Sequence, residues 1–110
     1  MFHRCYYVYI VTNVHKTVLY TGVTNNLQAR LLEHYNAHPG TFTGAYRAHY
    51  LLYYEADRYV LNAIAREKEI KGWTRRKKCA LINTLNPEWR FLNDRFFAQW
   101  PPPPNAPRLR

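Results

Sequence analysis

Two runs of β-branched and aromatic residues, 6–11 and 18–23, constrain the fold of this chain more than any other feature. The residues between the runs are mostly polar, and two such runs joined by a short polar segment are typical of a β-hairpin. A turn at the middle of this segment places Tyr9 opposite Tyr20 across the two strands. The sequence therefore predicts a hairpin near the amino terminus with tyrosines on both strands.

The two faces of the expected hairpin differ in chemistry. Because side chains alternate along a strand, the face that carries Tyr9 and Tyr20 also carries Tyr7 and Gly22. The opposite face is more aliphatic and comprises Tyr6, Val8, Ile10, Leu19, Thr21 and Val23. We expect this second face to be the one that contributes to the hydrophobic core.

Three helices and a third strand are expected after the hairpin. Apolar residues at helical spacing, together with Thr, Asn, Gly and Pro at the ends, set their limits. The expected elements are a helix over 27–36, a loop over 41–46, a strand over 50–54, a helix from 57 or 58 to 71, and a helix from 74 to 86. The third strand is an unbroken apolar and aromatic run, which favours burial on both faces.

The second expected helix carries a carboxylate within its apolar stripe. Ala63, Glu67 and Ile70 recur at helical spacing, so Glu67 is expected on the face that packs against the protein. Three explanations fit: an ion pair with Arg66 or Lys71, a rotation of the helix that exposes the carboxylate, or a functional role. A buried carboxylate costs free energy unless it is paired or binds a metal, so Glu67 is the most informative single position.

Length, tail composition and cysteine content limit the kind of protein. A chain of 110 residues suffices for one domain, expected over 1–97, and the proline-rich segment 98–110 is expected to be an extended tail. No apolar run reaches the roughly 18 residues of a membrane span, so no membrane association is expected. Cys5 and Cys79 are too few for a disulfide scaffold and favour a reducing compartment, the cytoplasm.

Positive charge is concentrated in one region of the chain. Lysine and arginine total 16 against 7 acidic residues, a formal net charge of +9, which favours an anionic partner such as nucleic acid. The residues expected to contact nucleic-acid phosphates are Lys71, Arg75, Arg76, Lys77 and Lys78. The alternative is a solvated helix face that only aids solubility.

The residue types present exclude several catalytic classes. Serine is absent, which excludes serine hydrolases, and the glycines are scattered without a phosphate-binding loop. The pair His34 and His38 has zinc-ligand spacing, but no cysteine lies near it, which disfavours a zinc site.

The remaining polar residues suit phosphodiester hydrolysis. The hairpin supplies tyrosines, one helix supplies Arg30 and His34 four residues apart, and the next helix supplies Glu67. A carboxylate can bind Mg²⁺, an arginine can neutralise charge on phosphate oxygens, and a tyrosine or histidine can deprotonate the attacking water. Each of these residues also has an ordinary structural explanation, and only their combination favours catalysis.

The order and spacing of these residues resemble the GIY-YIG nuclease family, in particular its small stand-alone bacterial members. Tyr-Val-Tyr at 7–9 stands where the family has Gly-Ile-Tyr, and Tyr-Thr-Gly at 20–22 stands where it has Tyr-Ile-Gly. The run Ala-Ile-Ala-Arg-Glu-Lys-Glu-Ile-Lys-Gly-Trp at 63–73 resembles the segment that bears the family's metal-binding glutamate, and Asn-Pro-Glu-Trp at 86–89 resembles the end of the small members. The likeness covers roughly 5–92.

This resemblance implies an α/β (α+β) domain with a small three-stranded antiparallel sheet flanked by helices. It implies an endonuclease that uses Mg²⁺ or Mn²⁺ to hydrolyse DNA phosphodiester bonds, with a role in DNA repair or recombination. The family usually joins its nuclease domain to a separate DNA-recognition domain. Because none is evident here, we expect weak sequence specificity, or direction by branched or single-stranded DNA structure or by a protein partner.

The resemblance also implies the catalytic residues by position. Tyr9 would orient or deprotonate the attacking water, and Tyr20 would assist in orienting the water or the phosphate. Arg30 would stabilise charge on the phosphoryl group, and His34 would assist proton transfer or phosphate binding. Glu67 would bind the metal.

Gly22 would let the DNA backbone approach the sheet closely. Two positions depart from the family pattern: Tyr7 replaces a glycine, and the segment 43–46 lacks an expected basic residue.

Two other functions are kept as alternatives. One is a non-catalytic nucleic-acid-binding module on the same fold, and the other is a protein-interaction domain whose proline-rich tail docks elsewhere.

Overall fold

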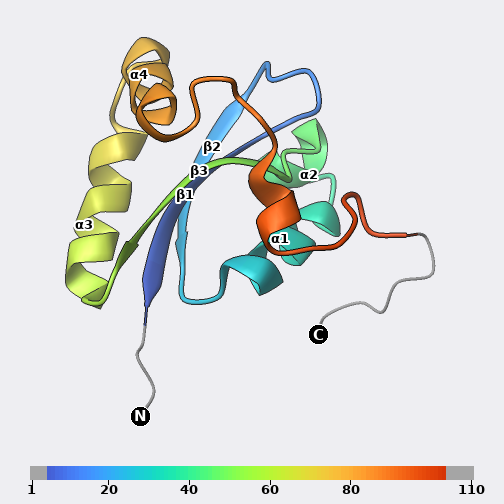
Figure 1. The fold of residues 1–110 in the computed structure, drawn as a ribbon, viewed down its shortest axis with the longest axis horizontal. Helices are drawn as coiled ribbons and strands as arrows, with labels where there is room; N and C mark the ends of the chain where they lie inside the picture. Colours follow the sequence, from blue (N-terminus) through green and yellow to red (C-terminus); the bar gives the residue numbers. More distant parts are fainter. Residues whose placement is uncertain (1–4, 104–110) are drawn as a thin grey trace.

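Residues 5–103 are described by a computed structural model, in which a three-stranded antiparallel sheet has helices on both sides (Figure 1). In chain order the elements are β1 (Tyr6–Thr12), β2 (Leu19–Thr24), α1 (Leu27–Tyr35), α2 (Phe42–Tyr46), β3 (Tyr50–Asp57), α3 (Val60–Lys71), α4 (Arg75–Leu85) and the 3₁₀ helix η1 (Leu92–Arg95). The strand order is β2-β1-β3, and both neighbours of β1 run antiparallel to it. The α+β fold class is confirmed.

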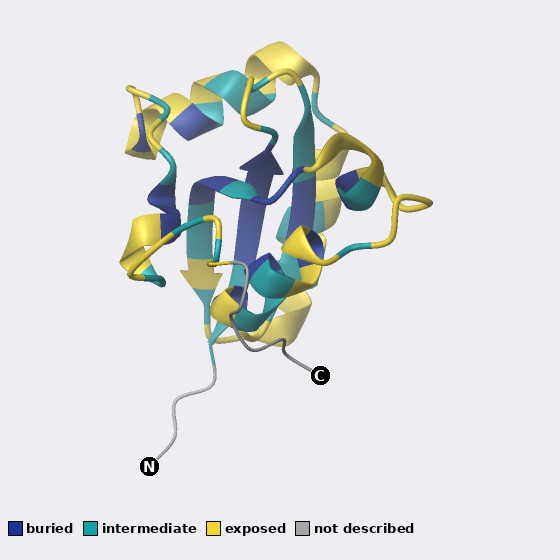
Figure 2. Cartoon of the chain, turned by 90° about the vertical axis from the view of Figure 1, so that its right-hand side faces the viewer, coloured by how far each residue is buried: buried dark blue, intermediate teal, exposed yellow. Residues whose placement is uncertain are grey.

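The sheet separates two hydrophobic clusters. On one face Val8 and Ile10 of β1 pack against α3 and α4, and on the other face Tyr9 and Val11 pack against α1. β1 is therefore buried from Val8 to Thr12 and lies at the centre of the molecule (Figure 2). The aliphatic face contributes to the core as predicted, and the tyrosine face does so too, because helices cover both faces.

The predicted hairpin forms, but its register is shifted by two residues. Tyr9 lies opposite Gly22 rather than Tyr20. The turn explains the shift: the Lys16 N–H donates to the Asn13 carbonyl at 3.0 Å, and Lys16 adopts the left-handed backbone conformation, with φ 59°. The turn thus closes later in the chain than a turn centred on the polar segment. Because the shift is an even number of residues, the side chains stay on their predicted faces.

Helix α1 is rotated from its predicted orientation. Leu27 and Leu31 are buried as expected, but the third buried residue is His34. The four-residue spacing of Leu27, Leu31 and Tyr35 predicts that Tyr35 belongs to the same apolar stripe, but Tyr35 is 39% exposed. The side chain of Asn26 caps the helix by accepting a backbone N–H from its first turn at 3.0 Å. The rotation points the imidazole of His34 towards the sheet.

The segment 41–46 contains the short helix α2, so the prediction of a loop was wrong. Thr41 caps this helix by accepting the Gly44 N–H at 3.1 Å, and Arg47 ends it in the left-handed conformation, with φ 52°. Gly44 packs so closely on the backbone carbonyl of His38 that a Cβ would collide with it. Capping and this close approach hold α2 in place.

Strand β3 is longer than predicted, so α3 begins later. β3 extends to Asp57, whose carboxylate accepts the Tyr59 N–H at 2.8 Å where the chain turns into α3. Helix α4 has nearly its predicted limits, with Thr74 as its cap. None of the helices within residues 5–103 has the length and apolar character that crossing a membrane requires.

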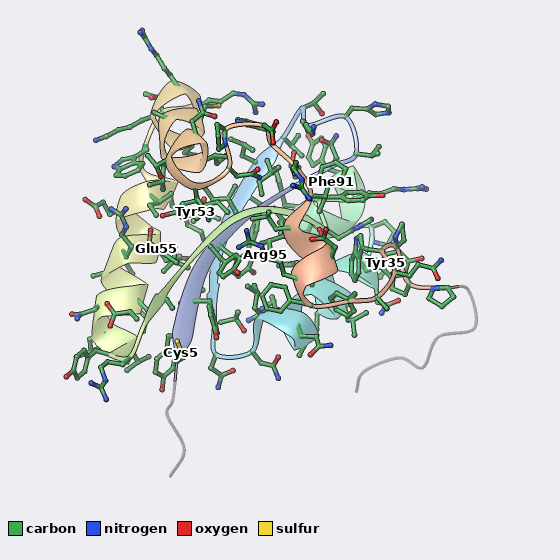
Figure 3. All side chains as sticks on the ribbon, viewed as in Figure 1. Cys5, Tyr35, Tyr53, Glu55, Phe91 and Arg95 are labelled. Atoms are coloured by element: carbon green, nitrogen blue, oxygen red, sulfur yellow. The ribbon has the colours of Figure 1, made fainter. Side chains whose placement is uncertain are left out.

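The carboxy-terminal segment packs on the α1 side of the sheet. Asn93 of η1 donates to the His49 carbonyl at 3.0 Å. The Trp100 ring contacts the rings of His49 and Tyr35, the latter labelled in Figure 3. Part of the predicted tail is therefore held against the domain, and the predicted domain boundary stays a prediction. Residues 104–110 lie outside the described residues.

Candidate active site

Three side chains form a hydrogen-bonded chain between β1, α1 and α2. The Tyr9 hydroxyl lies 2.6 Å from His34 Nε2, and His34 Nδ1 lies 3.1 Å from the Thr43 hydroxyl oxygen. Tyr9 is 1% exposed and His34 is 8% exposed. The structure thus brings two of the predicted catalytic residues into direct contact, and adds Thr43.

Burial sets the protonation of this pair. Burial, with a smaller contribution from the Arg30 charge, lowers the pKa of His34 from 6.5 to about 4, so the imidazole is neutral at pH 7. Burial also raises the pKa of the Tyr9 phenol, which therefore keeps its proton. Two proton arrangements satisfy both contacts: Tyr9 donates to Nε2 while Nδ1–H donates to Thr43, or both bonds run in the reverse direction.

Arg30 extends from the same helix as His34. Its Nε atom is buried and has no hydrogen-bond partner among the described residues, whereas NH1 lies 3.2 Å from Glu33. The Arg30 charge lowers the pKa of both His34 and Tyr9, so the guanidinium acts on the pair. A buried donor without a partner is costly and marks a place that a ligand can complete. Arg30 is therefore a candidate phosphate ligand.

Tyr20 lies beside the buried pair on the edge strand β2. Its ring centroid is 5.4 Å from that of His34, in an edge-to-face arrangement. On α2 the Phe42 ring stacks against Tyr20 at 5.9 Å. Tyr20 is half-buried, so part of this predicted catalytic residue faces solvent.

Glu67 lies on α3, which packs on the opposite face of the sheet from His34. Its carboxylate is 13% exposed and accepts the Lys71 ammonium at 2.7 Å. Lys71 Nζ lies 5.5 Å from the Tyr20 ring centroid, and the Glu67 charge contributes to the raised pKa of Tyr9. The acid therefore lies on the α3 side of the sheet, close to the edge strand β2, where Lys71 links it to Tyr20.

Of the partners considered for Glu67, the observed one is Lys71. The hydrogen bond from Lys71 to Glu67 raises the pKa of the ammonium. Arg66 pairs elsewhere, with Glu55 at 3.1 Å and with Glu69 at 2.9 Å. The ion pair explains how a carboxylate is tolerated in the apolar stripe of α3.

The donor set at this edge fits one kind of metal. Residues 5–103 contain no group of three His, Cys, Asp or Glu that could hold a metal ion, so Glu67 would be a lone protein carboxylate. Mg²⁺ and Mn²⁺ are oxygen-preferring cations, and Mg²⁺ keeps several waters and binds through one or two carboxylates plus substrate phosphates. Zinc does not fit, because it takes three or four protein ligands.

Gly22 makes room for Tyr9. The two residues face each other across β1 and β2, and a Cβ at Gly22 would collide with the Tyr9 hydroxyl group. Gly22 does not have a positive φ, so the requirement is space and not backbone conformation. This contact accounts for the glycine of the second motif. A close approach of DNA at Gly22 stays a prediction.

Two of the predicted DNA-binding residues have partners within the protein. Arg75 donates to the backbone carbonyls of Lys16 and Thr17 at 3.0 and 3.1 Å, which ties the start of α4 to the β1–β2 turn. The Lys71 ammonium lies on Glu67. Lys71 therefore lies beside Tyr20, whereas Arg75 lies at the β1–β2 turn.

The other three basic residues are on α4. Arg76 and Lys77 are exposed, and Lys78 is half-buried. Lys77 Nζ lies 4.5 Å from the ring centroid of Trp73. Contact between these residues and DNA stays a prediction.

Sequence reasoning missed Thr43 and Phe42, because both lie in the segment predicted to be a loop. The signal that could have revealed α2 is the spacing of Thr41 and Gly44. A threonine can cap a helix by accepting the backbone N–H three residues later, which here belongs to Gly44. Neither the contact of Thr43 with His34 nor that of Phe42 with Tyr20 has a sequence signature.

A cavity of about 550 Å³ lies away from this site, between β3 and α3. No predicted catalytic residue lines it. Of its charged residues, Arg66 pairs with Glu55 and with Glu69, and Asp57 accepts the Tyr59 N–H. Because acidic residues outnumber the one arginine, the cavity does not favour the binding of a phosphate.

The fold and the site define a class of protein: a small α+β domain with a buried tyrosine–histidine pair and an arginine on one face of a three-stranded sheet, and an ion-paired acid on the helix of the other face, close to the edge strand. Residues 5–80 match the family described as the GIY-YIG catalytic domain. The chain belongs to the GIY-YIG nuclease family, as its motifs predict.

The relatives are small bacterial proteins. A UPF0213 protein of Bacillus pumilus is 37% identical over 70 residues, which cover 64% of this chain and 71% of the relative. A UPF0213 protein of Staphylococcus saprophyticus is 35% identical over 78 residues, which cover 71% and 94%. The solution NMR structure of a UPF0213 protein from Bacillus halodurans aligns with a TM-score of 0.49 at 27% identity, over 77% of this chain and 89% of that chain.

Proposed function

We propose that this protein is a divalent-metal-dependent DNA endonuclease that hydrolyses phosphodiester bonds. The observation that carries the proposal is the buried Tyr9–His34 contact beside an arginine Nε that has no partner among the described residues. Two groups that can move a proton and one donor that can bind a phosphate oxygen are the elements that this hydrolysis needs.

The proposed proton path uses the first of the two hydrogen-bond arrangements. The Tyr9 hydroxyl donates to His34 Nε2, and its lone pair accepts a hydrogen from the attacking water. As the water oxygen bonds to phosphorus, the bond between phosphorus and the leaving sugar oxygen breaks, and the leaving oxygen takes a proton from solvent. The proton of the attacking water passes to the Tyr9 oxygen and the phenolic proton passes to His34. A neutral imidazole can accept this proton, and the lowered pKa of His34 keeps it neutral before the reaction.

The remaining residues position the substrate. The buried Nε of Arg30 donates to a phosphate oxygen, where its charge stabilises the negative charge that develops. Tyr20, half-exposed beside His34, orients the water or the phosphate. Glu67 would hold Mg²⁺ or Mn²⁺ in place of its ion pair with Lys71. The metal supplies Lewis acidity when bound.

Binding of DNA follows from the charge of the chain. The formal net charge is +9, and basic side chains flank the β2 edge. We propose weak sequence specificity or direction by DNA structure, a role in DNA repair or recombination, cytoplasmic location, and targeting by a protein partner. Both cysteines are free, in keeping with a reducing compartment.

One observation favours the alternative of a non-catalytic nucleic-acid-binding module. The Lys71 ammonium donates to the Glu67 carboxylate at 2.7 Å, and this ion pair would compete with a metal for the carboxylate. The two functions differ in whether the protein cleaves DNA when a divalent metal is present. The endonuclease should need the Glu67 carboxylate for cleavage, whereas the binding module should bind DNA without cleaving it.

The test is cleavage of a panel of labelled DNAs, single-stranded, duplex and branched, with Mg²⁺, with Mn²⁺ and with EDTA. We expect Glu67→Gln to lower the cleavage rate at least about 100-fold, because the loss of metal ligation removes several kcal/mol of transition-state stabilisation. Glu69→Gln is the matched control, since Glu69 lies on the same helix but pairs with Arg66.

Equal cleavage by the wild type and by Glu67→Gln would refute the role of Glu67. Tight DNA binding by the wild type without cleavage under any of these conditions would establish the binding module instead.

A further inference from the structure

A row of aromatic rings leads outwards from the candidate active site over α2. The Phe42 ring stacks against Tyr20 at 5.9 Å, with 28° between the ring planes, and Tyr46 lies 4.8 Å beyond Phe42. Phe42 is 44% exposed and Tyr46 is 51% exposed. The row therefore begins beside His34 and ends in solvent.

The row is held in place by the same helix that supports the catalytic pair. Phe42 and Tyr46 are four residues apart on α2 and share its outer face. Thr43, on the inner face, is buried and contacts His34 at 3.1 Å. One short helix thus presents two rings to solvent while it positions the imidazole, so the rings have a defined place relative to the site.

We propose that Phe42 and Tyr46 form a stacking platform for unpaired bases of a single-stranded DNA segment next to the scissile phosphate. This proposal rests on the proposed nuclease function and names the substrate class. Base stacking on aromatic side chains tolerates any sequence, because every base has a π-face. In duplex DNA the faces of the bases are already stacked on their neighbours, so the platform favours single strands.

The charges around the row fit a nucleic-acid strand. Arg47 follows Tyr46 directly and is exposed. At the other end Lys71 lies 5.5 Å from the Tyr20 ring centroid. The buried Nε–H of Arg30 has no acceptor among the described residues and can donate to a ligand. Cations at both ends of an aromatic row match a chain of bases joined by phosphates.

A second copy of this chain is a poorer occupant of the row. Two aromatic side chains bury about 150–250 Å² each, whereas a stable protein interface takes about 800 Å² from each partner. Nucleobases need only the ring faces that Phe42 and Tyr46 expose.

The test measures binding separately from cleavage. A 5′-labelled oligothymidylate and the same strand in a duplex are titrated with the protein in EDTA, and binding is followed by fluorescence anisotropy. We expect Phe42→Ala and Tyr46→Ala each to weaken single-strand binding about 5- to 100-fold, while duplex binding changes less than about twofold. Phe42→Trp should retain single-strand binding.

Tyr59→Ala is the matched control, because Tyr59 is also an exposed tyrosine, 61% exposed, but lies at the start of α3. A strand containing 2-aminopurine gives a second readout with the unmodified protein, since stacking on the platform changes its fluorescence. Loss of α2 structure in the alanine variants would leave the 2-aminopurine signal and Phe42→Trp as the test.

Three results would overturn the platform: unchanged single-strand binding in both alanine variants, equal loss of single-strand and duplex binding, or a dimer in sedimentation that both substitutions dissociate. Because binding in EDTA involves no hydrolysis, the platform can fail while cleavage is observed. Equally, the platform can hold while cleavage by the wild type is absent.

Discussion

The two faces of β1 are both buried, but different kinds of side chain bury them. Val8 and Ile10 point to the α3 face, where aliphatic and aromatic side chains surround them. Tyr9 lies between these two residues and points to the α1 face, where its hydroxyl meets His34. A buried polar group costs free energy unless it is bonded, and His34 supplies the partner of the Tyr9 hydroxyl.

The α3 face has a polar network of its own, and the comparison separates structure from function. The hydroxyl of Tyr53 donates to Glu55 at 2.8 Å, and Arg66 pairs with the same carboxylate. Tyr53 and Glu55 are labelled in Figure 3. That network is complete within the protein. Each face has one buried polar side-chain atom without a partner among residues 5–103, the Thr21 hydroxyl on the α3 face and Arg30 Nε on the α1 face. Only Arg30 Nε belongs to a positively charged group, and this charge is what a substrate phosphate would satisfy.

The largest expected effect contrasts the tyrosines of the two faces. Tyr9→Phe should lower the cleavage rate about 100- to 10,000-fold, because it removes the hydroxyl that passes the proton to His34. Tyr53→Phe removes a hydroxyl that only bonds Glu55 and should leave cleavage unchanged within a factor of about three. Single-turnover kinetics with matched circular dichroism spectra compare the two. Equal losses in both variants would end the distinction between the faces.

The second prediction concerns the pH dependence of stability on the α1 face. His34 has a pKa of about 4 in the folded protein against 6.5 in the unfolded chain, so below pH 6.5 the unfolded chain binds a proton that the folded protein does not. The contribution of His34 to the unfolding free energy is therefore fully present above pH 6.5 and is lost as the pH falls towards 4. Between pH 7.5 and pH 5, His34 should account for about 2 kcal/mol of lost unfolding free energy.

Urea denaturation at the two pH values measures this loss. His34→Asn should remove about 2 kcal/mol of the pH-dependent difference, whereas His15→Asn, in the exposed β1–β2 turn, should leave it unchanged. A pH-dependent difference that is the same in His34→Asn as in the wild type would show that His34 is not held neutral.

The smallest expected effect tests how Thr43 supports His34. Thr43→Val keeps the shape but removes the hydroxyl, which leaves His34 Nδ1 buried without its partner and should cost about 1 kcal/mol of unfolding free energy. The substitution should also change the tautomer balance of His34, measured by ¹⁵N chemical shifts of the imidazole. Unchanged shifts would mean that Tyr9 alone orients the ring.

Much of the fold could be predicted from the sequence because it depends on local chemistry. The β-branched runs form the hairpin, Asn26 and Thr74 cap their helices, and the apolar spacing of α1 and α3 is in the chain itself. The separation of the hairpin faces survived even a wrong register, because a shift of two residues keeps each side chain on its face.

Residue types and motif order were enough to predict which residues belong to the site. They were not enough to predict which of these residues contact one another. That Glu67 is nearly buried follows from the stripe of α3, but its choice of Lys71 over Arg66 depends on Glu55 of β3, which engages Arg66. Glu55 of β3 binds Arg66, which leaves Lys71 as the partner of Glu67. Because Glu55 belongs to another element, the spacing of residues along α3 cannot reveal this pairing.

The sequence by itself determined the strands, the helix caps, the apolar stripes and the family, because each follows from neighbouring residues or from a motif. The tertiary structure decided that His34 rather than Tyr35 faces the sheet, that Thr43 lies against His34, and that Phe42 stacks on Tyr20. These contacts join residues of different elements. Packing of α1 and α2 on the sheet determines them, and no local propensity encodes that packing.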